Sequence, residues 1–306
     1  MQNYVEPFFG SGAVLLGRQG EDFGIETVND ADGFLANFWR AVQHDPDQVA
    51  RWADWPVNEN DLHARHAWLV PKREKLTAKL EGDPDHFDAK IAGWWVWGLC
   101  AWIGSGWCSG KGPWITNEEG ELINSRSFPH LGDAGRGINR KLPHLGNAGR
   151  GVHRTSFSIY ELFHELSERF RRVRVCCGDW TRVLGPTPTV KNGLTGIFLD
   201  PPYSADANRD NELYAVESVV VAHTVREWAI VHGDNPLLRI ALCGYEGEYD
   251  MPIDWVCMKW KATGGYESQG GASAGENCRR ERIWFSPHCI RPVELVGLFD
   301  GLEDAS

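Results

Sequence analysis

The chain has 306 residues, 42% of them hydrophobic, a length that exceeds the usual size of one hydrophobic core and predicts one elaborated α/β domain or two lobes. Its net charge of −11 does not favour DNA binding through the body of the protein, because such binding draws affinity from neutralising phosphates. No targeting or membrane-spanning segment is visible, and the eight cysteines form no Cys-x-x-Cys pair, so we expect a cytoplasmic protein with reduced core cysteines, no membrane partner and no metal.

A strand, a glycine turn and a helix are predicted at the start of the chain, over Tyr4-Val5-Glu6-Pro7-Phe8-Phe9-Gly10-Ser11-Gly12-Ala13-Val14. Gly10 and Gly12 allow the backbone to approach a ligand closely, although a glycine pair by itself is more often a plain turn. A second strand, 25–28, ends at Asn29-Asp30, about 20 residues beyond the turn, where nucleotide-binding folds place an acid on the ribose hydroxyls. We therefore expect Asp30 to bind ribose, while Asp32 begins the next amphipathic helix.

The middle of the chain is predicted to be mainly helical and rich in tryptophan. Helical spacing covers 58–80, and an aromatic helix covers 87–103, whose tryptophans we expect to pack in the core. Trp107 lies in a glycine-rich loop beside Lys111, where it either helps to hold a nucleobase or forms a turn with a partly buried indole. Sequence reasoning leaves both alternatives open.

A basic segment with an internal repeat follows. Pro129-His130-Leu131-Gly132-Asp133-Ala134-Gly135-Arg136-Gly137 recurs as Pro143-His144-Leu145-Gly146-Asn147-Ala148-Gly149-Arg150-Gly151. Arginines flanked by glycines suit contacts to phosphate or to a guanine edge, so Arg136, Arg140, Arg150 and Arg154 join Lys111 as candidate DNA contacts. A local duplication that forms a surface loop is the structural alternative.

The most informative motif is Asp200-Pro201-Pro202-Tyr203, which follows the apolar run 196–199. An exocyclic amine is a weak nucleophile, and a site that methylates it must accept its hydrogens while holding its nitrogen in line with a methyl donor. Asp200 offers one acceptor, the carbonyl of Pro201 offers a second, and Tyr203 offers a face for stacking an extruded base. The same four residues also fit an ordinary strand-to-loop corner.

Seven strands are predicted in all, and they indicate a twisted sheet. They cover 4–8, 26–28, 173–177, 197–199, 238–243, 255–261 and 282–286, with a helix at 215–232 between the fourth and fifth.

Together these segments resemble the Dam-like, alpha-class DNA adenine-N6 methyltransferases, which use S-adenosylmethionine. The resemblance covers most of the chain and implies a seven-stranded Rossmann-like methyltransferase sheet whose last two strands form an antiparallel edge. It implies that residues 1–50 begin the catalytic domain, that 51–155 form an inserted, mainly helical target-recognition domain for duplex DNA, and that 156–306 complete the catalytic domain.

The resemblance also assigns site residues. Donor-binding residues would be Glu6, Pro7, Phe8, Gly10, Ser11, Gly12 and Asp30, with Asp179 and Trp180 on the donor's adenine, and the catalytic residues would be Asp200, Pro201, Pro202 and Tyr203. The implied reaction is methyl transfer to N6 of a flipped adenine.

One feature departs from the family, whose members carry an upstream Trp-x-Gly-Gly-Lys segment that packs on the donor's methionine portion. This sequence begins three residues before its first motif strand, so poor donor affinity is expected. Two alternatives to the adenine reaction are kept, namely cytosine-N4 methylation, which more often uses a motif beginning with Ser, and a catalytically weak DNA-binding module.

Overall fold

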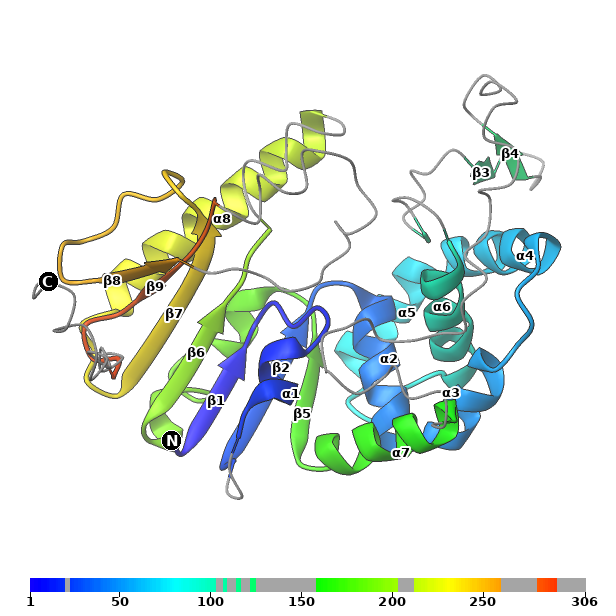
Figure 1. Cartoon of the computed structure of the whole chain (residues 1–306), viewed down its shortest axis with the longest axis horizontal. Coiled ribbons are helices and arrows are strands. Elements are labelled where there is room, and N and C mark those ends of the chain that lie inside the picture. The colour runs from blue at the N-terminus through cyan, green and yellow to red at the C-terminus, as the bar shows by residue number, and fades with distance from the viewer. Residues whose placement is uncertain are drawn as a thin grey trace, which may run out of the picture.

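Seven strands form one mixed sheet in the computed structural model, which describes residues 1–19, 23–102, 107–108, 114–116, 122–124, 158–202, 212–259 and 280–290. The spatial order is β5-β2-β1-β6-β7-β9-β8 (Figure 1). The strands are β1 (Asn3–Glu6), β2 (Ile25–Asp30), β5 (Val173–Cys177), β6 (Thr195–Leu199), β7 (Leu238–Tyr245), β8 (Val256–Lys259) and β9 (Glu281–Phe285). All seven correspond to strands predicted from the sequence.

The five neighbouring strands β5, β2, β1, β6 and β7 are parallel. Strand β9 pairs antiparallel with both β7 and β8. The expected antiparallel edge is therefore present in an α/β fold of the Rossmann-like kind. The chain moves from β1 to β2 on one side and returns through β6 on the other, so the strand order reverses beside β1. In open α/β sheets, ligands bind at such a reversal, outside the carboxyl ends of the strands. A separate hairpin, β3 (Trp114–Thr116) with β4 (Leu122–Asn124), was not predicted.

Helices cover both faces of the sheet. Side chains alternate between the two faces along each strand, so neighbouring residues of one strand pack against different helices. Tyr4 of β1 belongs to a hydrophobic cluster with the helices from α2 to α7, whereas the adjacent Val5 belongs to a second cluster with α8. Figure 1 shows α2 to α7 gathered beside β5, and α8 beside β7. The helices are α1 (Ala13–Gly17), α2 (Gly33–His44), α3 (Pro46–Ala53), α4 (Glu59–Leu69), α5 (Arg73–Gly82), α6 (Ala89–Ala101), α7 (Ile159–Phe170) and α8 (Glu212–His232).

Side-chain caps define where several helices begin. Asp32 accepts a hydrogen bond from the amide of Phe34 and caps α2, as expected from the sequence. Ser158 and Glu161 form a reciprocal capping box at α7. The aromatic helix α6 also agrees with its prediction, and its Trp97 is fully buried.

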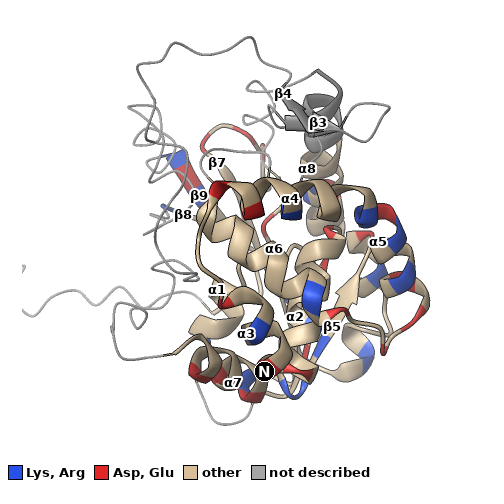
Figure 2. Ribbon diagram, turned by 90° about the vertical axis from the view of Figure 1, so that its right-hand side faces the viewer, with Lys and Arg blue, Asp and Glu red and all other residues tan. Residues whose placement is uncertain are grey.

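The helices after residue 50 pack on the same core as the sheet. The boundary between residues 50 and 51 falls inside α3, and Leu62, Leu80 and Val96 of later helices share one cluster with Tyr4. The described part of the 51–155 segment is thus continuous with the α/β core, while its expected end at residue 155 lies outside the described residues. Figure 2 shows both acidic and basic residues on α3, α4 and α7.

Within the described residues, no helix is long and apolar enough to cross a membrane, and no group of three or more His, Cys, Asp or Glu is arranged to hold a metal. The seven cysteines in these ranges are all free thiols, as the spacing predicts. Six of the seven are buried or partly buried, namely Cys100, Cys108, Cys176, Cys177, Cys243 and Cys289, while Cys257 is exposed.

Candidate cofactor and catalytic site

The carboxyl ends of four parallel strands bring distant motifs to one edge of the sheet. Glu6 ends β1, Asp30 ends β2, Cys177 ends β5, and Asp200 directly follows β6. The register pairs Asp30 with Cys177, and it pairs Glu6 with Val28, two residues before the end of β2. Residues separated widely in sequence therefore meet beside the reversal in strand order.

The turn after β1 needs glycine at two positions. Gly10 and Gly12 have φ of 50° and 70°, a left-handed conformation that side chains other than glycine rarely adopt. A Cβ on Gly12 would lie 2.8 Å from Cζ of Phe9, whereas a Cβ on Gly10 would meet nothing within 4 Å. The Nε1 of Trp39 donates to the Gly10 carbonyl at 3.2 Å. The Trp39 hydrogen bond therefore holds the turn in place, while the space beside the Gly10 α-carbon is open. Ser11 is exposed.

Asp30 connects this turn to the start of α2. Its Oδ2 accepts the amide of Gly10 at 3.0 Å, and its Oδ1 accepts the amide of Asp32 at 2.8 Å. Burial raises the pKa of Asp30 above its ordinary value, and these two amides oppose that effect. A carboxylate has about four lone-pair directions, so two amide bonds fix its orientation and leave acceptor capacity for a ligand.

Asn29 is a structural residue of this edge that sequence reasoning did not single out. It is 1% exposed, and its Nδ2 donates to the carbonyl of Pro7 at 3.1 Å and to that of Gly178 at 2.9 Å. One amide group thus joins the segments that follow β1 and β5. An amide side chain at the end of a strand, next to a candidate ligand residue, was the available signal.

Asp179 and Trp180 both have structural partners. Asp179 is exposed, and its Oδ1 accepts the amide of Thr181 at 2.9 Å, capping the short helix η4 (Trp180–Val183). Trp180 is 8% exposed and stacks on Phe8, with ring centroids 6.1 Å apart. The structure thus brings Phe8 and Trp180, two of the predicted donor-binding residues, into contact. Their contact with a donor's adenine stays a prediction.

Glu6 is the most unusual titratable group of the site. It is 2% exposed, and its Oε2 accepts the hydroxyl of Tyr4 at 2.8 Å. Burial raises the pKa of Glu6 to about 8, the hydroxyl of Tyr4 opposes the shift, and the negative charge of Asp200 adds to it. At neutral pH the Glu6 carboxyl is therefore mostly protonated.

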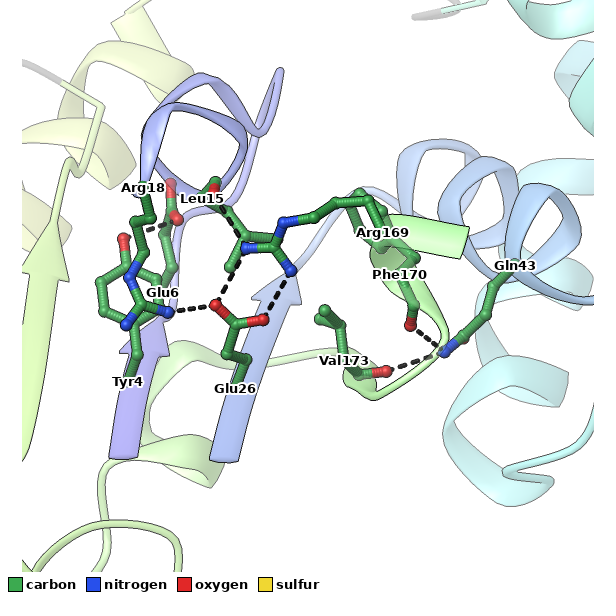
Figure 3. Close-up of polar contacts among 9 residues, drawn as sticks. All are labelled: Tyr4, Glu6, Leu15, Arg18, Glu26, Gln43, Arg169, Phe170 and Val173. Carbon is green, nitrogen blue, oxygen red and sulfur yellow. Dashed lines mark hydrogen bonds and ion pairs between the residues drawn. The ribbon is translucent and has the colours of Figure 1, made fainter. Parts of the chain in front are cut away.

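An ion-pair network lies between α1, β2 and α7 (Figure 3). Glu26 of β2 is 3% exposed and receives a bidentate pair from Arg169, at 2.7 and 2.9 Å, and an ion pair from Arg18. Arg169 also donates to the carbonyl of Leu15 in α1 at 3.0 Å, and Arg18 lies over the ring of Tyr4. The helix after the turn is thereby tied to the sheet and to α7. The spacing of these residues in the sequence gave no sign of this network.

The Asp-Pro-Pro motif leaves the sheet directly beside Glu6. Asp200 and Pro202 are exposed and Pro201 is buried, so the acid faces outward at the end of a buried strand. Tyr203 lies outside the described residues. The five candidate DNA contacts also lie outside them, namely Lys111, Arg136, Arg140, Arg150 and Arg154.

In a scan against protein-family models no family matches this chain, and a search of curated proteins finds no match either.

Proposed function

We propose that this chain is an S-adenosylmethionine-dependent methyltransferase that modifies the exocyclic N6 amine of adenine in duplex DNA. The observation that carries the proposal is the meeting of four motif segments at the carboxyl edge of the sheet, beside the reversal in strand order. The antiparallel edge formed by β8 and β9 agrees with the same resemblance.

The residues at this edge fit an adenosine-containing cationic donor. The open side of Gly10 gives room for close approach, and the anchored Asp30 carboxylate suits ribose hydroxyls. Ser11 and Gly12 complete the turn, and Phe8 with Trp180 supplies aromatic surface beside it. S-adenosylmethionine, when bound, supplies an electrophilic methyl group. Loss of the Glu6 proton would place a negative charge in a buried site, where it favours a cation strongly.

The Asp200-Pro201-Pro202 segment would hold the target amine. The Asp200 carboxylate accepts one amino hydrogen and the Pro201 carbonyl accepts the other, which keeps the nitrogen lone pair directed at the donor. Tyr203 stacks on the extruded base. As the new nitrogen–carbon bond forms and the donor's sulfur–carbon bond breaks, the amine loses one proton, and Asp200 is the nearest acceptor in this arrangement.

Duplex DNA is the proposed partner, with Lys111 and the four arginines of the repeat segment contacting phosphates or base edges. The proposed location is the cytoplasm.

Nucleoside analysis tests the proposal directly. The purified chain is incubated with S-adenosylmethionine carrying an isotope-labelled methyl group and a random-sequence duplex pool, and the digested DNA is measured by mass spectrometry. Labelled N6-methyladenine that disappears in Asp200→Ala supports the proposal. Labelled N4-methylcytosine would establish the alternative reaction instead, and DNA binding with no saturable donor site would indicate a binding module.

A further inference from the structure

Arg73, the first residue of α5, joins two parts of the molecule that lie far apart in the sequence. Its guanidinium donates to Oδ1 of Asp32 at 2.9 Å and, through Nε and the other terminal nitrogen, to the carbonyl of Cys108 at 3.3 and 3.0 Å. The same group lies 4.7 Å from the ring centroid of Phe34. Arg73 thus bridges the start of α2 and the turn that follows α6.

Asp32 is connected to the candidate donor site by backbone and side-chain contacts. Its amide donates to Asp30, whose second oxygen accepts the amide of Gly10. Its own Oδ1 accepts both the amide of Phe34 and the guanidinium of Arg73. A ligand that binds the Asp30 carboxylate therefore contacts a group only one hydrogen bond from Asp32, the partner of Arg73.

The turn at Trp107 and Cys108 is held in an unusual conformation. Cys108 is 1% exposed and has φ of 54°, and among the described residues no other non-glycine residue has a positive φ. Such a conformation is strained for a residue with a side chain and persists only where neighbouring contacts enforce it. Here the Cys108 amide donates to Nδ1 of His66 at 3.4 Å, and the Trp107 indole donates to the Trp95 carbonyl at 2.9 Å.

The packing of Trp107 gives the turn a second anchor. A Cβ placed on Gly98 of α6 would lie 1.8 Å from Cζ2 of Trp107, so the indole occupies the space that a glycine leaves free. Of the two sequence-based alternatives for Trp107, the buried turn is the one that its 8% exposure supports. The turn is also the last described point before the segment that contains Lys111.

We infer that Arg73 is a positioning residue that couples the donor edge of the sheet to the Trp107–Cys108 turn. This inference rests on the proposed function, because it takes S-adenosylmethionine as the ligand of the Asp30 edge. Coupling of this kind requires a continuous set of contacts whose arrangement both sites influence. The contacts from Gly10 through Asp30, Asp32 and Arg73 to Cys108 form such a set.

Hydrogen exchange tests the coupling without DNA. The full chain is measured by mass spectrometry with and without S-adenosylmethionine, and exchange is followed in the peptide that contains Cys108. We expect donor binding to slow exchange there several-fold, and we expect this slowing to be lost in Arg73→Met, which keeps an apolar stem over Phe34 but has no donor groups. Lys79→Met is the matched control on the same helix, since Lys79 is exposed and its side chain makes no hydrogen bond or ion pair within the described ranges.

A second variant protects the test against misfolding. Asp32→Asn keeps a good helix cap while weakening the ion pair with Arg73, and it should also lose the slowing at Cys108. The coupling alone is overturned if the parent protein binds the donor but exchange at Cys108 does not slow. It is also overturned if both variants bind the donor and keep the slowing seen in the parent. Absence of donor binding to the parent protein overturns the proposed function, and the coupling with it.

Discussion

Replacing Glu6 by Gln should make the protein progressively more stable than the parent as pH rises. The pKa of Glu6 is about 8 in the folded protein and 4.5 at its ordinary value, which we take for the unfolded chain. Between these values the unfolded chain releases a proton that the folded protein retains, so each pH unit lowers the parent's free energy of unfolding by up to about 1.4 kcal/mol. The contribution of Glu6 to stability is fully present below pH 4.5 and is lost as pH rises through 8.

Gln has nearly the same shape and can still accept the hydroxyl of Tyr4, but it does not titrate. Urea unfolding of Glu6→Gln and the parent should therefore differ little at low pH, and the gap should widen by about 2 kcal/mol from about pH 6 to about pH 8. Glu74→Gln, which removes an exposed carboxyl on α5, is the control for the change in net charge. An equal pH dependence of the two gaps would refute the assignment of a buried, protonated Glu6.

The other predictions concern the proposed reaction and the glycine turn. Asp200→Ala should abolish methyl transfer with donor affinity largely kept in calorimetry, and retained transfer would remove Asp200 from the catalytic role. Asp30→Ala should instead raise the donor concentration for half-saturation, since a ribose acceptor contributes ground-state binding; an unchanged affinity would contradict that role. Gly12→Ala should lower the free energy of unfolding by about 1–2 kcal/mol and weaken donor binding, because φ is 70° there and the new methyl group meets the ring of Phe9. A thermal unfolding midpoint equal to that of the parent would disprove this. Alanine at both Arg150 and Arg154 should reduce the slope of log affinity for DNA against log salt by about 0.9 for each lost phosphate contact, and a parental slope would identify a plain surface loop.

Strands such as β6 and β7 were predictable because they contain short apolar runs, which are typical of buried parallel strands. The start of α2 was predictable for a local reason as well, since Asp32 caps the helix that directly follows it. The position of Asp30 followed from its spacing to the glycine turn. These features depend on residues close together in the sequence.

The supports of the site could not be predicted in the same way. Arg169 reaches Glu26 across 143 positions of the chain, and Arg73 reaches Cys108 across 35. Long side chains of this kind look like ordinary solvated charges in a helical pattern, and only the packing of the helices decides which of them meet a buried acceptor. The raised pKa of Glu6 has the same origin, because burial by distant elements causes it.

The order of these contacts explains why the site edge can be both rigid and available to a ligand. Backbone amides of Gly10 and Asp32 hold Asp30, the amide group of Asn29 holds the carbonyls of Pro7 and Gly178, and neither set uses the open side of Gly10. A carboxylate restrained by two amides loses little freedom when it accepts hydroxyl groups, so more of the interaction energy appears as affinity. Anchoring from within the protein therefore suits Asp30 to the proposed role of ribose ligand at this edge.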